Sequence, residues 1–189
     1  MNFLKKHIKI ISYFIALIFV SLNSSCVNDL DTIKKITYKS TDPEERTSDL
    51  NVFYTDSGYA KIEVFAALAE TYEKPEPLVK FKDGVKVKFF DDNGEVVSVL
   101  TALYGEIRQN KGTIVVRDSV QLYNEKKKQR LETEELFWNQ KDSAIFTDKA
   151  VVIRTPDALF FGKGVRTKQD FSSYQFIKPQ GKINLKNQH

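Results

Sequence analysis

The chain has 189 residues, of which 29 are basic and 25 acidic, and it carries a single cysteine. This length is enough for one domain with a full hydrophobic core. The lone cysteine excludes an internal disulfide framework. The net charge of +4 does not indicate nucleic-acid binding, because three lysines lie in residues 1–25 and the rest of the chain has 26 basic against 25 acidic residues.

Residues 1–25 have the layout of a secretory signal. Lys5, Lys6 and Lys9 form a positive start, residues 10–22 are an apolar run of 13, and small polar residues follow. The run is shorter than the roughly 20 residues that a membrane-spanning helix needs. We therefore predict a signal peptide over residues 1–25, with an uncleaved membrane anchor as the alternative.

Cys26 directly follows this segment, with Leu22 four residues before it. The arrangement is similar to the lipobox of bacterial lipoproteins, although the usual box has its leucine three residues before the cysteine. We predict that Cys26 is acylated, the alternative being a spare buried thiol. Stable anchoring would need more than one acyl chain. Residues 26–50 are rich in acidic residues and predict a tether, followed by one domain over residues 51–189.

The remaining chain predicts short strands joined by turns. Residues 59–71 are rich in alanine, which is also compatible with a helix, but they alternate as a strand does. Asn93-Gly94 between alternating runs is a strong hairpin signal. The predicted strands are residues 51–54, 59–71, 79–89, 96–107, 113–123, 131–138, 144–154, 159–167 and 174–185. The fold class is therefore all-β: an antiparallel sandwich, barrel or roll.

A strand pattern with a polar break recurs along the chain. Residues 79–89 alternate apolar and basic residues and are interrupted at Asp83-Gly84. Aligned on this break, the pattern returns at Asp118, Asp148 and Pro179, with spacings of 35, 30 and 31 residues. Each repeat comprises one hairpin, and hairpins must stack to bury a face. The aspartates could be a ligand set, but Asp is poor in strand interiors, so we predict bends or bulges there.

The sequence offers little for catalysis. After residue 25 the only histidine is His189, and the familiar nucleophile, zinc and phosphate-loop motifs are missing. The adjacent carboxylates Asp91-Asp92 and Glu134-Glu135 are placed by a hairpin loop and by a strand, where neighbours point to opposite faces. We predict that the protein is not an enzyme, with no catalytic residues, no metal and no cofactor.

The apolar positions of the repeats are predicted to share one face of the sheet. They either fill an ordinary core or, in a bent sheet, line an apolar trough that holds lipid. These predicted groove residues are Phe81, Val85, Val87, Phe89, Val116, Val120, Leu122, Phe146 and Val152.

The segment Lys80-Phe81-Lys82-Asp83-Gly84-Val85, the repeated Asp-centred strands and the segment at residues 67–72 resemble the LptC family. The resemblance covers residues 50–185. It implies a bent β-jellyroll (LptA/OstA-like) that receives lipopolysaccharide from an inner-membrane ABC transporter and passes it to an LptA-like bridge. The strand at residues 174–185 would be the partner edge, with Tyr174, Phe176, Ile177 and Ile183.

The same resemblance implies a protein of the bacterial envelope that faces the periplasm and is anchored, at the inner membrane. Better-known members of the family keep an N-terminal transmembrane helix, which a lipidated Cys26 would replace here. The alternative is a structural or adhesive β-rich envelope lipoprotein with a closed core and no lipid cargo.

Overall fold

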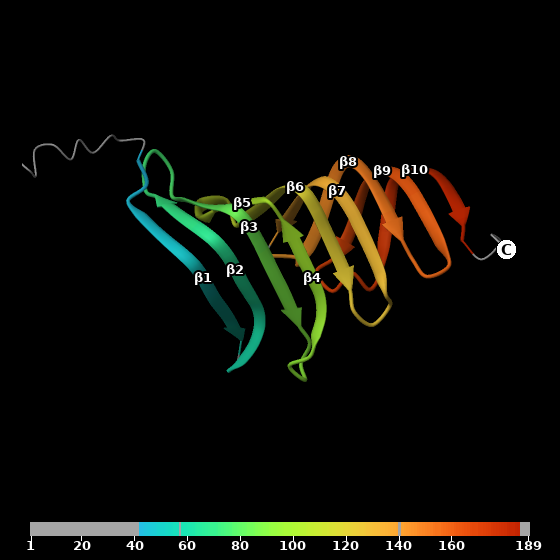
Figure 1. The fold of residues 1–189 in the computed structure, drawn as a ribbon, viewed down its shortest axis with the longest axis horizontal. Coiled ribbons are helices and arrows are strands. Elements are labelled where there is room, and N and C mark those ends of the chain that lie inside the picture. Colours follow the sequence, from blue (N-terminus) through green and yellow to red (C-terminus); the bar gives the residue numbers. More distant parts are fainter. Residues whose placement is uncertain (1–41, 57, 140, 186–189) are drawn as a thin grey trace, which may run out of the picture. The chain divides into compact units, whose positions relative to one another are not determined.

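A computed structural model describes residues 42–56, 58–139 and 141–185 (Figure 1). The predicted signal, Cys26 and most of the predicted tether lie outside these residues. The elements in chain order are β1 (Glu45–Asp56), β2 (Tyr59–Tyr72), β3 (Leu78–Phe90), β4 (Val96–Ala102), β5 (Tyr104–Arg108), the 3₁₀ turn η1 (Gln109–Lys111), β6 (Thr113–Asn124), β7 (Gln129–Asn139), β8 (Ala144–Arg154), β9 (Ala158–Lys168) and β10 (Tyr174–Asn184).

All ten strands belong to one antiparallel sheet, so the predicted all-β class is confirmed. The sheet follows the chain order, and β4 and β5 share one place between β3 and β6. The ambiguous stretch at residues 59–71 is a strand, β2. Two predictions were wrong in detail: β1 begins at Glu45, inside the predicted tether, and the strand predicted at residues 96–107 is interrupted at Leu103.

A line of backbone irregularities crosses the sheet near the middle of its strands. The predicted bulges are confirmed, because the pairing register shifts at Asp83-Gly84, at Asp118-Ser119, between Thr147 and Ala150, and between Pro179 and Gly181. Asp83 and Asp118 have φ values of 60° and 65°, a conformation that aspartate tolerates better than most residues. We call this feature the bend line, since bulges bend a sheet.

The bend line divides the sheet into two arms that face each other. The first arm contains β5 and the second arm contains β4, with Leu103 between them. Leu103 accepts a hydrogen bond from the Gly84 N–H and donates one to the Asp118 carbonyl, which joins three strands at the bend. The rings of Phe89 and Trp138 meet edge to face at 5.4 Å, although β3 and β7 are not neighbours. The arms therefore close over a shared core.

The core consists of cross-strand rows of side chains on each arm that point into the space between the arms. One row pairs Leu100 with Leu122, Leu122 with Leu131, and Leu131 with Ile153. The side chains of Leu122, Leu131 and Ile153 are 0% exposed. Burying each such side chain contributes about 1.5–3 kcal/mol, so these rows provide much of the energy that holds the arms together.

The third repeat shows why the predicted apolar face was partly wrong. In β8 the inward residues are Ile145, Thr147, Val151 and Ile153, whereas Phe146 is only half-buried. Thr147 and Val151 therefore correspond to the buried pair Phe81 and Val85, and the alignment on Asp148 is one residue out of register. A slip of one residue moves every side chain of a strand to the other face. Phe146 and Val152 consequently lie on the outer side.

A loop between β9 and β10 ties the two arms together at their free ends. We call residues 169–173 the strap. Side chains of the second arm donate to its consecutive carbonyls: Ser98 to Gln169 at 2.5 Å, Asn124 to Asp170 at 2.7 Å, and Gln129 to Phe171. Lys127 donates to Ser172.

Phe171 itself is 0% exposed and has a φ of 49°. A surface hairpin loop rarely buries a phenylalanine, since loops normally run over the surface. We call the opening between the free ends of the two arms the mouth. The strap inserts an aromatic side chain into this mouth, and its burial contributes about 1.5–3 kcal/mol.

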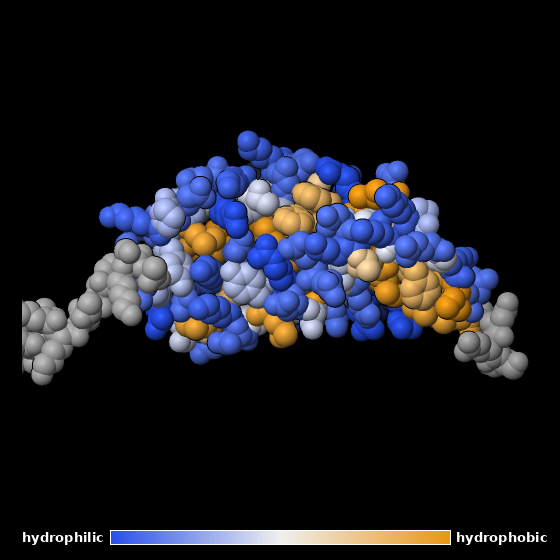
Figure 2. All heavy atoms as spheres, turned by 90° about the horizontal axis from the view of Figure 1, so that it is seen from above, coloured by the Kyte–Doolittle hydropathy of each residue, from blue (hydrophilic) through white to orange (hydrophobic). Residues whose placement is uncertain are grey.

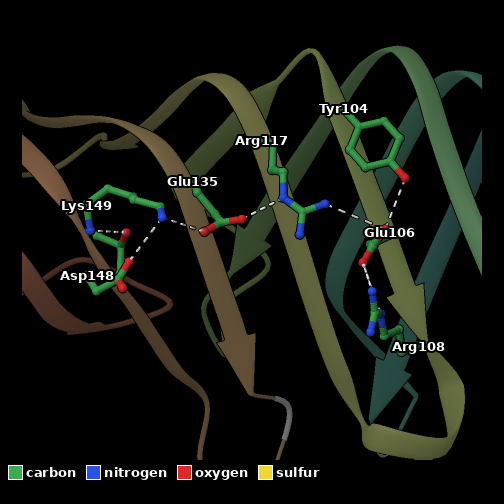
Figure 3. A network of polar contacts seen from close by, with 8 residues as sticks. Tyr104, Glu106, Arg108, Arg117, Glu135, Asp148 and Lys149 are labelled. Carbon is green, nitrogen blue, oxygen red and sulfur yellow. Dashed lines mark hydrogen bonds and ion pairs between the residues drawn. The ribbon is translucent and has the colours of Figure 1, made fainter.

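The outer side of the first arm carries a network of charged residues (Figure 3). Arg117 donates to Glu135 at 2.5 Å and lies 3.7 Å from Glu106, while Lys149 lies 3.8 Å from Glu135. Tyr104 donates to Glu106 at 3.0 Å. Burial, followed by this hydrogen bond, raises the pKa of Tyr104 to about 12. The network links β5, β6, β7 and β8 beside the bend line.

We expect Tyr104→Phe to flatten the alkaline loss of stability. Unfolded tyrosine has a pKa of about 10, so between pH 10 and pH 12 the unfolded state loses a proton that the folded state keeps. The stabilising contribution is complete below about pH 10 and is lost as the pH rises through about 12. Denaturant unfolding across this range should show that the free energy of unfolding falls less steeply with pH in the variant. The difference in slope should correspond to at most one proton. An unchanged slope would show that Tyr104 does not titrate as described.

Candidate functional site

An open cleft of about 440 Å³ lies between the arms at the N-terminal end of the sheet. Its walls come from β1, β2, β3 and β5, where the arms are not filled by the core. The side chains facing it are mostly apolar. The apolar lining residues are Leu50, Val52, Val64, Ala69, Val79, Phe81 and Ile107.

The local sequence explains why the space stays open here. On β2 the inward positions nearest the bend line are Ala66 and Ala69, 0% and 5% exposed, whereas the positions in register with Ala69 on β6 and β7 are the larger Val116 and Leu136. Alanine side chains are too small to span the gap between the arms. β1 is an edge strand, paired on one side only with β2. The space between the arms is therefore least filled by side chains at the β1 end of the sheet.

Four residues that line the cleft have polar side chains: Glu45, Thr47, Tyr54 and Thr71. Among the described residues that line it, none is basic. An isolated charge is costly to place against apolar walls. The cleft is therefore suited to a neutral, extended apolar group such as an acyl chain.

The nine predicted groove residues are distributed over three environments. Phe81 lines the cleft. Val85, Val87, Phe89, Val116, Val120 and Leu122 are at most 5% exposed and belong to the closed core. Phe146 and Val152 are outside it, and Phe146 stacks on Phe137 at 5.4 Å.

Sequence reasoning missed most of the cleft lining. Leu50 and Val52 were placed in the tether or in a short first strand, and Val64, Ala69, Val79 and Ile107 were read only as strand positions. Their signal was the alternation of apolar residues in residues 59–71, with small residues among them. That signal could not show which part of the inner face stays unfilled.

The opposite end of the sheet is formed by β10, which pairs only with β9. Ile177 and Ile183 are 61% and 48% exposed, whereas Tyr174 and Phe176 pack against the core. Gly162 permits this packing, because a Cβ there would come within 2.3 Å of the Phe176 ring. In Figure 2 apolar surface gathers toward this end of the sheet. Half of the predicted partner edge is thus free to meet another molecule.

Comparison with known protein families gives a match that covers most of the chain. Residues 13–178 match the family described as lipopolysaccharide-assembly, LptC-related. The chain belongs to this LptC-related family. A search of the curated proteins found no match. Family membership supports a role in lipopolysaccharide transport and a place in the bacterial envelope, within a family of transport components.

The structure adds two observations on anchoring and metals. In residues 42–56, 58–139 and 141–185, no helix is long and apolar enough to cross a membrane. The same part of the chain contains no cluster of three or more side chains that could hold a metal ion. Acylation of Cys26 falls outside these residues and stays a prediction.

Proposed function

We propose that this LptC-related protein is a passive carrier that holds an acyl part of lipopolysaccharide in the cleft. The family match over residues 13–178 supports lipopolysaccharide as the cargo, and the cleft offers a place for one of its acyl chains. The volume of about 440 Å³ is within the range of roughly 300–1,000 Å³ typical of small-molecule sites. The mostly apolar lining, which contains no basic residue among those described, matches an acyl chain.

The energetics of such a carrier are close to neutral. Each acyl CH₂ taken out of water contributes about 0.8 kcal/mol, but a chain that moves from a bilayer into the cleft only exchanges one apolar environment for another. Direction must then come from a partner. We propose an inner-membrane ABC transporter as the source of lipid and of energy, with the Cys26 lipid anchor keeping this protein at that membrane.

The other end of the sheet is the proposed exit. β10 presents an unpaired edge with Ile177 and Ile183 exposed, and an exposed edge strand is a template for adding a further strand. We propose that an LptA-like bridge docks there. The cargo would then run along the inner face from the β1 end to the β10 end.

A pair of photo-crosslinking positions tests the proposed cargo site. A photoreactive phenylalanine analogue at Phe81 should label with lipopolysaccharide, because Phe81 faces the cleft. The same analogue at Phe146 should not, since Phe146 lies on the outer side against Phe137. The measurement is a lipid-dependent mobility shift after irradiation. Equal labelling at both positions, or labelling at Phe146 alone, would contradict the proposal.

A further inference from the structure

We propose that the strap, residues 169–173, is a gate that closes the mouth between the arms and opens to admit lipopolysaccharide beyond the cleft. The inference rests on the proposed function and concerns how that site is regulated. Two observations support it. The inner face between the cleft and β10 is too tightly packed to hold lipid, and the strap is held to the second arm by side-chain hydrogen bonds.

The first observation concerns the middle of the inner face. The cleft ends where the core begins, and the residues between it and β10 are tightly packed: Val116, Leu122, Leu131 and Val165 are each at most 3% exposed. Protein cores of this kind have little empty space. A lipid with several acyl chains therefore cannot lie along the whole inner face unless the arms separate.

The arms can separate at only one of their two borders. At the bend line they are continuous chain, further tied by the backbone bonds of Leu103. At the mouth, the strap reaches the second arm through side chains alone: Ser98, Asn124 and Gln129 donate to its carbonyls. These three donors are 0–6% exposed. Side-chain bonds to a loop can be released without breaking any strand pairing.

The conformation of Phe171 in the strap is favourable only while the mouth is closed. Phe171 fills the mouth from a backbone conformation with φ of 49°, which is unfavourable for a bulky residue. It lies 5.7 Å from the ring of Tyr174, the first residue of β10. Movement of Phe171 out of the mouth would therefore expose the inner face beside the exit strand.

The chain contains a built-in reporter for this movement. Trp138 is its only tryptophan, is 6% exposed, and contacts Phe89 across the mouth. Its indole N–H is buried without a hydrogen-bond partner in the described part of the chain. Separation of the arms would give this group water or lipid as a partner and would change the tryptophan emission.

The test uses the full-length protein with purified lipopolysaccharide. We expect lipid binding to increase hydrogen exchange in residues 169–173 and to shift the Trp138 emission, while the amides of Leu122 and Leu131 stay protected. Phe171→Ala should raise the apparent affinity and uptake rate about tenfold by enlarging the open fraction. Phe146→Ala, the same change on the outer side of β8 where Phe146 stacks on Phe137, is the matched control and should leave both unchanged.

The outcomes separate the two proposals. If lipopolysaccharide binds while the strap stays protected and Phe171→Ala behaves like Phe146→Ala, the gate is wrong and the carrier function stands. If the wild-type protein binds no lipopolysaccharide, the proposed function fails and the gate with it. Faster uptake by both variants would show that general loosening, and not the strap, controls entry.

Discussion

Val52→Glu is expected to reduce the affinity for lipopolysaccharide at least tenfold, which corresponds to about 1.4 kcal/mol. Val52 faces the cleft from the edge strand β1 and is opposed by Val64 on β2. A carboxylate there would lose hydration against the apolar walls whenever an acyl chain entered. Without cargo it can stay solvated, so the protein should still fold. Titration of the lipid with full-length protein gives the affinity.

Phe53→Glu is the matched control for this change. Phe53 is the next residue of the same strand, is 54% exposed, and does not line the cleft. The two variants have the same added charge in the same strand and differ in the face that carries it. Comparable losses in both would mean that charge or β1 pairing, and not the cleft, determines binding.

Leu122→Ala is expected to lower the free energy of unfolding by about 2–5 kcal/mol, the usual cost of a large-to-small change in a packed core. Leu122 is 0% exposed and pairs with Leu100 and Leu131 in the central row between the arms. The cavity left behind cannot be filled by backbone that is fixed in the sheet. Denaturant unfolding of the variant measures the loss.

Leu103→Ala provides the comparison for this prediction. Leu103 is a leucine of the same sheet, but it sits on the bend line and is 58% exposed. Its structural contacts are backbone hydrogen bonds, which alanine keeps. The expected change is within about 0.5 kcal/mol. If Leu122→Ala cost no more than this, the central row would not be the packed core described above.

Several parts of this protein could be predicted because they depend on local sequence. Alternation with period two predicts strands wherever one face is buried, and each of the nine predicted ranges overlaps strand in the structure. The bulges at Asp83 and Asp118 were predictable too, since aspartate is unfavourable within a regular strand and tolerates a positive φ. The one-residue error at Asp148 shows the limit: an aspartate marks a bulge but does not fix which residue is its centre.

The candidate site could not be predicted in the same way. The same alternation describes Val52, Leu122 and Val165, yet one lines an open cleft and two lie in a closed core. Which applies depends on the side chains of the opposing arm, such as the small Ala66 and Ala69, and on long-range packing. The strap was predicted only as a turn, because its partners Ser98, Asn124 and Gln129 are 42–71 residues away in the chain.

The sequence by itself determined the all-β class, the repeated hairpins and their bends, and the resemblance that the family match then confirmed. These features follow from the spacing of apolar and polar residues within each strand. Only the tertiary structure decided where the inner face is filled, where it is open and what closes its mouth. Filling and closure depend on the distance between two arms that the bend line brings together, and that distance is a property of the folded sheet.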